Sequence, residues 1–381
     1  MPSFQLMELF APYFADLPDP RIDRTKQHAL LDILILALCA TLGGANGWAD
    51  IERFGKAKLD FFRQFLALPN GIPAHDTFGR VFARLDPIAL ASCIQKWLAA
   101  FRDALDRELV AIDGKTLRGS FDTAAGQNPL HLVSAWAGEA RLVLGQVAAA
   151  AHSNEITAIP LLLELLDLQG CIVTIDAMGC QKEIAEAIRA QEADYVLTVK
   201  GNQETLYEDI STFFIDCLDQ DFAGVPHRCC KTVDHNHGRH ETRHYTVVAV
   251  PEAIRERHAW RDLHSIGMVY AQRQVGDEEV EVETRFFISS LAPKVKAFAR
   301  AVRGHWGIEN RLHWSLDVTF AEDQSRVRKD HGPANLGMLR RLALSILQQD
   351  TSSKDSLRGK RLSAGWDEDR LLKLLTGFCG K

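Results

Sequence analysis

Two aspartates occur in the same local setting, each directly after an isoleucine that ends a run of strand-forming residues. Asp113 follows the predicted strand Leu109 to Ile112 in "AIDGK", and Asp176 follows the predicted strand Ile172 to Ile175 in "TIDAMG". In open α/β sheets, side chains at the carboxyl ends of strands emerge from a rigid scaffold into a crevice. A simple turn aspartate is the alternative, since aspartate is common at strand ends. Two such residues in equivalent settings favour a shared acidic site.

A third carboxylate interrupts the amphipathic pattern of "RGHWGIENRLHWSLDVTF". In this stretch and the residues before it, apolar residues recur at helical spacing with one gap, and Glu309 fills the gap. The apolar residues are Val295, Phe298, Val302, Trp306, Leu312 and Leu316. The pattern predicts that Glu309 points inward, where a carboxylate needs a cation beside it. A structural pair with His305 or His313, each one turn away, explains this helix equally well. Gly304 and Gly307 each weaken a helix by about 1 kcal/mol relative to alanine, which suggests close approach of another group to the backbone.

Carboxylates converging from two strand ends and a helix would form a hard, all-oxygen site suited to Mg²⁺ or Mn²⁺. Two such ions, about 3.5 to 4 Å apart, can activate an attacking hydroxyl and stabilise the leaving oxygen in phosphodiester cleavage. No Ser/His/Asp grouping, P-loop or GxGxxG motif competes with this chemistry. The stretch "DHNHGRHETRHY" lacks a second ligand cluster at zinc-site spacing, so we interpret its histidines as exposed groups at a turn entering a strand: His235, His237, His240 and His244. Its "HGRHETR" segment could still contact phosphate.

The elements that must position these residues change in type along the chain. Residues 1–105 show helical periodicity throughout, and three strands with short connections follow from Glu108. Next come a helix, the strand ending at Asp176, a second helix and the strand "DYVLTVKG", which is the pattern of parallel crossover units. This order predicts a mixed α+β or α/β fold with a ribonuclease-H-like core. We expect four regions: a helical N-terminal domain (1–105), the first part of the core (106–201), a β-rich insertion (202–293), and core completion with the glutamate helix (294–381).

Composition restricts the class of protein. The chain has 381 residues, enough for two or three domains, and its hydrophobic content of 46% with 25% charged residues is ordinary for a globular protein. Eight scattered cysteines without a CxxC pair suggest reduced thiols and a cytoplasmic location. The formal net charge of -6 gives no overall attraction for a polyanion, so any nucleic-acid partner must be held by local basic patches.

Several blocks together resemble the DDE transposases of bacterial insertion sequences, and more narrowly the H-repeat-associated group. The blocks are "HDTFGRVF", "AIDGKTLRGS", "TIDAMGCQKEIAEAI", "YVLTVKGNQ", "HGRHETR", "HWGIENRLHWSLDVTFAEDQSRVR" and "SAGWDEDRLLKLL". The resemblance covers nearly the whole chain. It implies that Asp113, Asp176 and Glu309 are the catalytic, metal-binding carboxylates, and that Mg²⁺ or Mn²⁺ is the cofactor. It also implies DNA as partner, both terminal inverted repeats and target DNA, with a homodimer or higher assembly in the DNA complex.

The glutamate helix departs from this resemblance at three places. Related enzymes carry Tyr, Arg and Lys around the glutamate, where this chain has Val302, His305 and Leu316. The phosphate-contacting role is therefore unassigned, and a solvated helix face is the alternative for each single candidate. We expect DNA contacts from residues near the carboxylates and from a downstream basic patch, namely Lys200, Arg303, Asn310, Arg311, Arg326, Arg328 and Lys329.

The N-terminal region contains a possible DNA-reading helix. The stretch "GIPAHDTFGRVFARLD" has a proline-bounded turn, a possible cap at Asp76, and then a short helix that presents Arg80 and Arg84. Solvated surface is the simpler interpretation of two such arginines. The sequence as a whole predicts a transposase that cuts element ends and joins them to target DNA. The alternatives are a transposase-derived DNA-binding protein without strand transfer, and a ribonuclease-H-like nuclease or resolvase.

Overall fold

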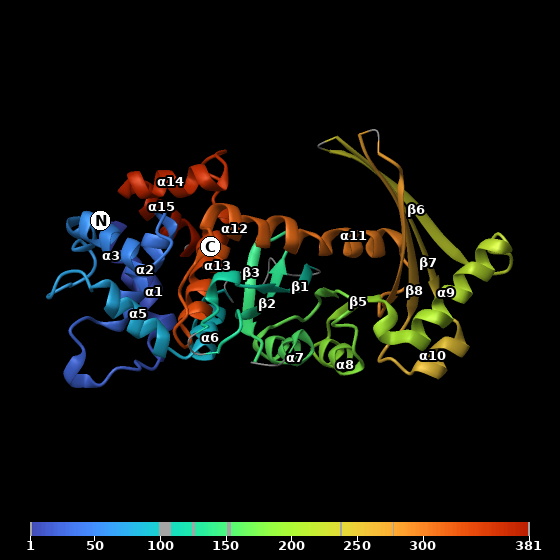
Figure 1. Ribbon diagram of the computed structural model, residues 1–381, viewed down its shortest axis with the longest axis horizontal. Coiled ribbons are helices and arrows are strands. Elements are labelled where there is room, and N and C mark those ends of the chain that lie inside the picture. Colours follow the sequence, from blue (N-terminus) through green and yellow to red (C-terminus); the bar gives the residue numbers. More distant parts are fainter. Residues whose placement is uncertain are drawn as a thin grey trace.

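The computed structural model describes residues 2–98, 108–123, 126–150, 154–236, 238–276 and 278–379. The molecule is elongated, with a helical lobe at one end, a sheet in the middle and long strands at the other end (Figure 1). Within these described ranges, the strands form one sheet of nine, in the order β3-β2-β1-β4-β5-β9-β8-β7-β6. Within the described part of the chain, no helix is long and apolar enough to cross a membrane.

The helical lobe combines both ends of the chain. Its N-terminal helices are α1 (Pro2–Phe14), α2 (Leu30–Leu42), α3 (Trp48–Ala57), α4 (Leu59–Phe62), α5 (His75–Arg84) and α6 (Pro87–Leu98). The C-terminal helices α13 (Gly332–Gln349), α14 (Leu357–Trp366) and α15 (Glu368–Cys379) pack against α1, α2, α5 and α6. The expected helical N-terminal region is confirmed as far as residue 98, while residues 99–105 lie outside the described part. The possible cap at Asp76 is wrong, because Ala74 holds the N-cap position of α5 and no side chain caps it.

The middle of the sheet has the predicted ribonuclease-H-like order. Its elements are β1 (Leu109–Thr116), β2 (His131–Ala137), β3 (Leu142–Ala148), α7 (Glu155–Leu165), β4 (Ile172–Ile175), α8 (Lys182–Ala190) and β5 (Asp194–Val199). Strands β1, β2 and β3 form an antiparallel meander, whereas β4 and β5 add in parallel beside β1. The nearly continuous apolar runs of β4 and β5 fit this position, since both faces of a parallel sheet are covered.

The expected β-rich insertion continues this sheet rather than forming a separate one. Strand β9 (Glu281–Ser289) pairs antiparallel with β5, and β8 (Ser265–Val275), β7 (Arg239–Ala249) and β6 (His227–Asn236) follow outward. Two helices accompany these strands, α9 (Glu204–Asp219) and α10 (Glu252–His258). Because β9 of the insertion is hydrogen-bonded to β5 of the core, the insertion has a fixed orientation relative to the carboxylates.

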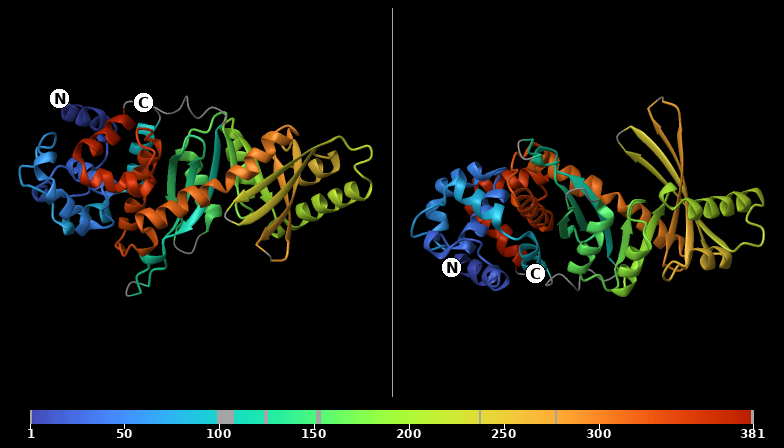
Figure 2. Two further views of the ribbon diagram at one scale, coloured as in Figure 1. Left: turned by 90° about the horizontal axis from the view of Figure 1, so that it is seen from above. Right: turned by 60° about the horizontal axis from the view of Figure 1, so that its bottom comes forward.

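A long helical element crosses the sheet and joins the insertion to the helical lobe (Figure 2). It consists of α11 (Val295–His305), the π-helical segment η5 (Ile308–His313) and α12 (Trp314–Phe320). Helix α11 packs against β1 and β4, and α12 packs against α13. Short 3₁₀ turns complete the described elements: η1 (Asp23–Thr25), η3 (Arg118–Ser120), η4 (Gly201–Gln203) and η6 (Glu322–Gln324).

Candidate active site

Asp113 lies within β1 rather than at its end, so the predicted strand end at Ile112 is wrong. The antiparallel pairing with β2 continues to Thr116, with Asp113 opposite Ser134, whereas the parallel pairing with β4 stops at Ile112. Sequence alone could not predict this difference. On one edge β1 stays paired with β2 as far as Thr116, whereas on the other edge its pairing with β4 ends at Ile112. Asp113 therefore sits where β1 separates from β4, and it lines a cavity there.

Asp176 directly follows β4, as predicted. Its Oδ1 accepts hydrogen bonds from the backbone N–H of Met178, at 3.0 Å, and of Gly179, at 3.4 Å. The residue thus forms a turn, which was the simpler interpretation, and also lines the same cavity as Asp113. A carboxylate held at one oxygen by the backbone keeps its second oxygen in a fixed position, which suits a ligand role.

Glu309 does not point into the core, so the predicted inward position is wrong. It is exposed, and Trp306 on the same supposed apolar stripe is 40% exposed, whereas Ile308 and Leu312 are buried. The reason is the π-helical segment, whose wider turn shifts the register on which the 3.6-residue prediction depended. The side chain of Glu309 instead lines the cavity that Asp113 and Asp176 line, whose volume is about 330 Å³.

Neither proposed histidine partner pairs with Glu309. His305 Nδ1 lies 3.1 Å from Thr174 Oγ1, and His313 Nδ1 lies 3.6 Å from Asp113 Oδ2. Among the described residues, the side chain of Glu309 has no hydrogen bond or ion pair. A structural ion pair with His305 or His313 is therefore not the reason for this glutamate.

Burial and like charges disfavour the ionised form of Asp113. Burial, followed by the nearby carboxylate of Glu155, raises the pKa of Asp113 to about 7, with smaller contributions from Asp176 and Glu309. Burial and Glu155 also raise the pKa of Asp176. Burial lowers the pKa of His313 to about 3, so this imidazole is neutral at pH 7 and does not offset the acidic charge. Lys200 acts in the opposite direction on the pKa of Asp176, but burial and Glu155 outweigh it, so the carboxylates of this site favour a bound cation.

Sequence reasoning missed the carboxylate that most affects these two aspartates. Glu155 begins α7, and its Oε1 lies 2.8 Å from His131 Nε2 on β2. A methyl group at Gly114 would lie only 2.1 Å from Glu155 Oε1, so this glycine lets the glutamate approach β1 directly behind Asp113. A glutamate in the first turn of a helix is common, because it complements the helix dipole. The sequence context of Glu155 therefore gave no indication of its effect on the two aspartates.

The donor set fits a hard divalent cation, although the ligands are not gathered around one point. Asp113, Asp176 and Glu309 supply only carboxylate oxygens to one cavity. In the described residues, no group of three or more His, Cys, Asp or Glu side chains is close enough to hold a metal. The arrangement therefore offers ligands of the correct type from three elements, and a bound cation would have to draw them together.

Two further acidic residues of the same segment have structural partners instead. Asp317 Oδ1 lies 2.9 Å from Lys115 Nζ. Glu322 is fully buried as a side chain, and its Oε1 accepts a hydrogen bond of 2.9 Å from Arg341 Nη1. Asp317 and Glu322 thus differ from Glu309, whose side chain lines the cavity and forms no ion pair within the described residues.

Four of the candidate DNA-contacting residues lie around the glutamate helix. Lys200 lines the carboxylate cavity, and Arg303 and Asn310 line a larger adjoining groove of about 920 Å³. Arg311 lies on the other side of the helix, beside Gly307. The groove also contains arginines from the insertion that sequence reasoning did not select, Arg239, Arg243, Arg273 and Arg285.

The remaining candidates are exposed or stacked elsewhere. Arg80 and Arg84 are exposed on α5, and Arg326 and Lys329 are exposed after η6. Arg328 stacks on the ring of Phe121 at 4.6 Å, so part of its guanidinium is already in contact with protein. None of these five lines the carboxylate cavity.

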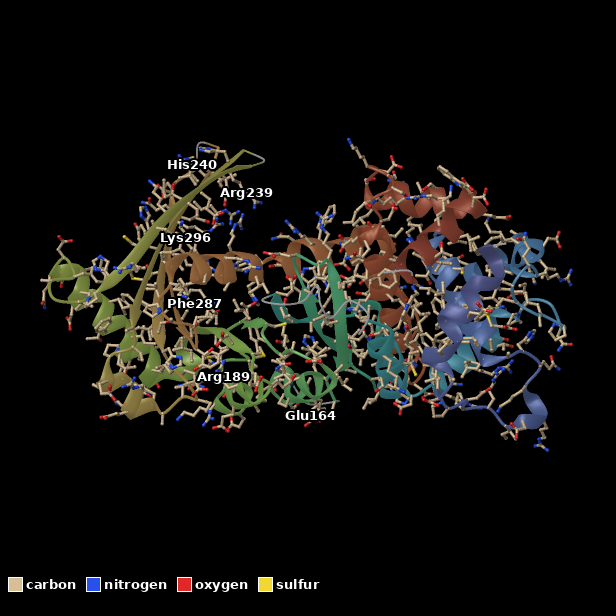
Figure 3. All side chains as sticks on the ribbon, turned by 180° about the vertical axis from the view of Figure 1, so that it is seen from behind. Glu164, Arg189, Arg239, His240, Phe287 and Lys296 are labelled. Atoms are coloured by element: carbon tan, nitrogen blue, oxygen red, sulfur yellow. The ribbon has the colours of Figure 1, made fainter. Side chains whose placement is uncertain are left out.

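The groove extends from the cavity toward the β6–β7 hairpin. Figure 3 shows Arg239 and His240 near the end of that hairpin, beyond the glutamate helix. His235, His240 and His244 are exposed, as predicted, while His237 lies outside the described residues. The seven cysteines whose side chains are described form no disulfide.

A core with strand order β3-β2-β1-β4-β5 and acidic residues on β1, after β4 and on the crossing helix defines a ribonuclease-H-like class of protein. Residues 104–346 match the family described as "Transposase DDE domain", and residues 11–98 match the family described as "DDE_Tnp_1-associated". The chain therefore belongs to the DDE transposase family.

Two curated relatives from Escherichia coli agree with this assignment. The "H repeat-associated putative transposase YhhI" of strain K12 is 39% identical over 365 residues, covering 95% of this chain and 96% of the relative. The "Putative transposase YncI" of strain O157:H7 is 40% identical over 352 residues, covering 92% of this chain and 90% of the relative. The resemblance to the H-repeat-associated group is thus confirmed over most of the chain.

Proposed function

We propose that this protein is an active transposase that cuts the DNA ends of its element and joins the freed 3′-hydroxyl to target DNA. The observation that carries the proposal is the shared cavity of Asp113, Asp176 and Glu309, in which Glu309 has no partner among the described residues. Carboxylates that share one cavity disfavour each other's ionised form unless a bound cation compensates for their charge. We propose DNA in the bacterial cytoplasm as the substrate.

Asp113, Asp176 and Glu309 would hold Mg²⁺ or Mn²⁺. When bound, the metal supplies an activated attacking oxygen and stabilises the leaving oxygen of the phosphodiester. The three carboxylates would hold the cation from three different elements of the fold. Asp176 is the most rigid of them, because the turn N–H groups of Met178 and Gly179 hold one of its oxygens.

Lys200 and Arg285 would neutralise the DNA phosphates at this site. Both line the carboxylate cavity, and Arg285 also lies 5.5 Å above the ring of Trp306. His305 does not supply this charge, since burial lowers its pKa to about 4. We propose that Arg285, from the insertion, takes over part of the phosphate-contacting role that the glutamate helix lacks at His305.

The test is a cleavage assay with a plasmid that carries the element and its native flanking DNA, in Mg²⁺ or Mn²⁺. Wild-type protein should nick or cut at the element ends. Glu309→Gln should abolish cleavage while its melting temperature and DNA affinity stay within error, because the amide keeps the shape and removes the charge. Asp60→Asn, at a side chain 99% exposed, is the matched control for removing one acidic charge. Cleavage by Glu309→Gln at the wild-type rate would refute the assignment.

A transposase-derived DNA-binding protein without strand transfer is the second candidate. Val302 and Leu316 are buried apolar residues where related enzymes carry Tyr and Lys, which favours it. Calorimetric titration with Mn²⁺ separates the candidates, since such a protein would bind DNA without binding metal through the three carboxylates. A resolvase would instead cut branched DNA without preferring the element ends, so a four-way junction belongs in the same assay.

A further inference from the structure

A buried hydrogen-bond donor without a partner lies on the other side of the glutamate helix. Trp136, on β2, is 0% exposed, and its Nε1 has no hydrogen-bond partner among the described residues. A buried donor left unpaired costs on the order of 1 to 3 kcal/mol. Trp136 lines a cavity of about 350 Å³ between the start of β1, the end of β2 and the glutamate helix.

The two glycines of the glutamate helix differ in what they contact, and only Gly307 lies beside this donor. A methyl group at Gly304 would lie 2.0 Å from Leu109 Cδ2, so that glycine is required for packing of α11 on β1. A methyl group at Gly307 would lie 3.8 Å from Trp136 Nε1, an ordinary contact, so packing does not require this glycine. Its backbone is also right-handed helical, with φ -61° and ψ -32°. Gly307 therefore weakens the helix and places no side chain beside the buried indole N–H of Trp136.

The cavity wall is rich in positive charge. Arg300, Arg303 and Arg311 line it, and Glu139 is the one acidic residue among the lining residues. The carboxylate of Glu139 lies 2.7 Å from Arg300 Nη2, so it is already neutralised. Arg303 Nη2 lies 3.0 Å from Asp234 in the adjoining groove. Arg311 is exposed and makes no ion pair within the described part of the chain, which leaves a free cation at the cavity mouth.

We propose that this cavity binds a phosphodiester group of a DNA backbone, with the indole N–H of Trp136 and the guanidinium of Arg311 as donors. A phosphate oxygen accepts hydrogen bonds from both groups, and the site offers N–H donors with a surplus of positive charge. Arg303, Trp306 and Asn310 line both this cavity and the groove beside the carboxylates. DNA that fills the groove can therefore continue across the helix. The inference rests on the proposed function, because it assumes DNA as the ligand.

The experiment measures binding of a short fluorescent duplex in EDTA, so that catalysis does not contribute. Gly307→Leu should raise the melting temperature, because leucine favours a helix over glycine, and weaken DNA binding by about tenfold, because its side chain covers the donor. Gly307→Ala is the matched control: it should stabilise the helix similarly, yet bind DNA nearly as wild type does. A stabilised protein with weaker binding is an outcome that a purely structural role of Gly307 would not produce.

Arg311→Gln supplies an independent measurement. It should reduce the slope of log affinity against log salt by about 0.9, the value for one lost phosphate contact. Arg255→Gln, on α10 at the far end of the insertion and paired with Glu252, is the charge-matched control and should keep the wild-type slope. Wild-type affinity and slope in both Gly307→Leu and Arg311→Gln would overturn the proposal.

The two proposals fail in different ways. If wild-type protein cleaves DNA with Mn²⁺ but these variants bind DNA as wild type does, the phosphate site is wrong and the catalytic proposal stands. If the variants lose affinity but wild-type protein never cleaves, the phosphate site stands and the catalytic proposal falls.

Discussion

Asp113 should destabilise the metal-free protein at neutral pH, and Asp113→Asn should relieve this cost. Burial and neighbouring carboxylates raise its pKa from 3.8 to about 7. Between these values the folded state holds a proton that the unfolded state has released. Stability therefore falls as the pH rises from about 4 to about 7 and is flat above that. Asparagine does not titrate, so the stability of Asp113→Asn should not fall in this way as the pH rises.

The magnitude follows from the size of the shift. About three pKa units correspond to at most about 4 kcal/mol, since one unit is about 1.36 kcal/mol. Because 26% of the side chain is exposed, water screens part of the penalty, and we expect about 2 kcal/mol. In a chain of this size, that is a difference of about 2 to 4 °C in melting temperature.

The assay is thermal unfolding of wild type and Asp113→Asn in EDTA, between about pH 5 and about pH 8. The variant's advantage should grow with pH up to about 7 and then remain constant, and Asp60→Asn should show no such growth. If these carboxylates bind metal, as the proposed function requires, adding Mn²⁺ at the highest pH should raise the wild-type melting temperature more than that of the variant. A difference that stays constant from pH 5 to pH 8 would refute the argument that like charges and burial burden Asp113.

Three further outcomes are expected. Glu322→Gln should cost about 3 to 5 kcal/mol of stability, since it breaks a buried ion pair, and chemical denaturation would measure the loss. Gly304→Ala should lower the melting temperature, because its methyl group would lie 2.0 Å from Leu109; an unchanged value would show that α11 shifts freely on β1. Replacing Arg80 and Arg84 together by glutamine should reduce the preference for terminal-repeat DNA over unrelated DNA in competition binding without altering the fold. Unchanged preference would mean that α5 does not read sequence.

The local patterns of the core were sufficient to predict its order of elements. Apolar runs ending in aspartate marked β1 and β4, and the alternation with helices marked the parallel half of the sheet.

The assignment of residues 1–105 as a DNA-binding domain remains a prediction, and the structure limits how it can be tested. Helices α13, α14 and α15 pack on the N-terminal helices, so deleting residues before the core would expose apolar surface that the C-terminal helices cover. Point substitutions at Arg80 and Arg84 are therefore a better test than truncation.

The errors concern geometry that sequence periodicity does not contain. A period of 3.6 residues assumes an unbroken α-helix, whereas the π-helical segment at Ile308–His313 turns Glu309 out of the core and toward the cavity. Glu155 reaches the site because α7 packs on the sheet, and Arg285 reaches it because β9 pairs with β5. Their sequence contexts, a first helical turn and an ordinary strand, gave no signal of that position.

Asp317 and Glu322 differ from Glu309 in their cationic partners. Asp317 and Glu322 follow Glu309 within thirteen residues, yet each has a cation of its own, in Lys115 and Arg341. These pairs fix α12 and the following turn to β1 and α13, and thereby hold the end of the helix that carries Glu309. Glu309 itself lies in the π-helical segment between two well-packed helices, and its side chain lines the cavity that Asp113 and Asp176 also line. On the proposed function, packing on both sides of this segment would limit how far Glu309 must move when a cation draws the three carboxylates together.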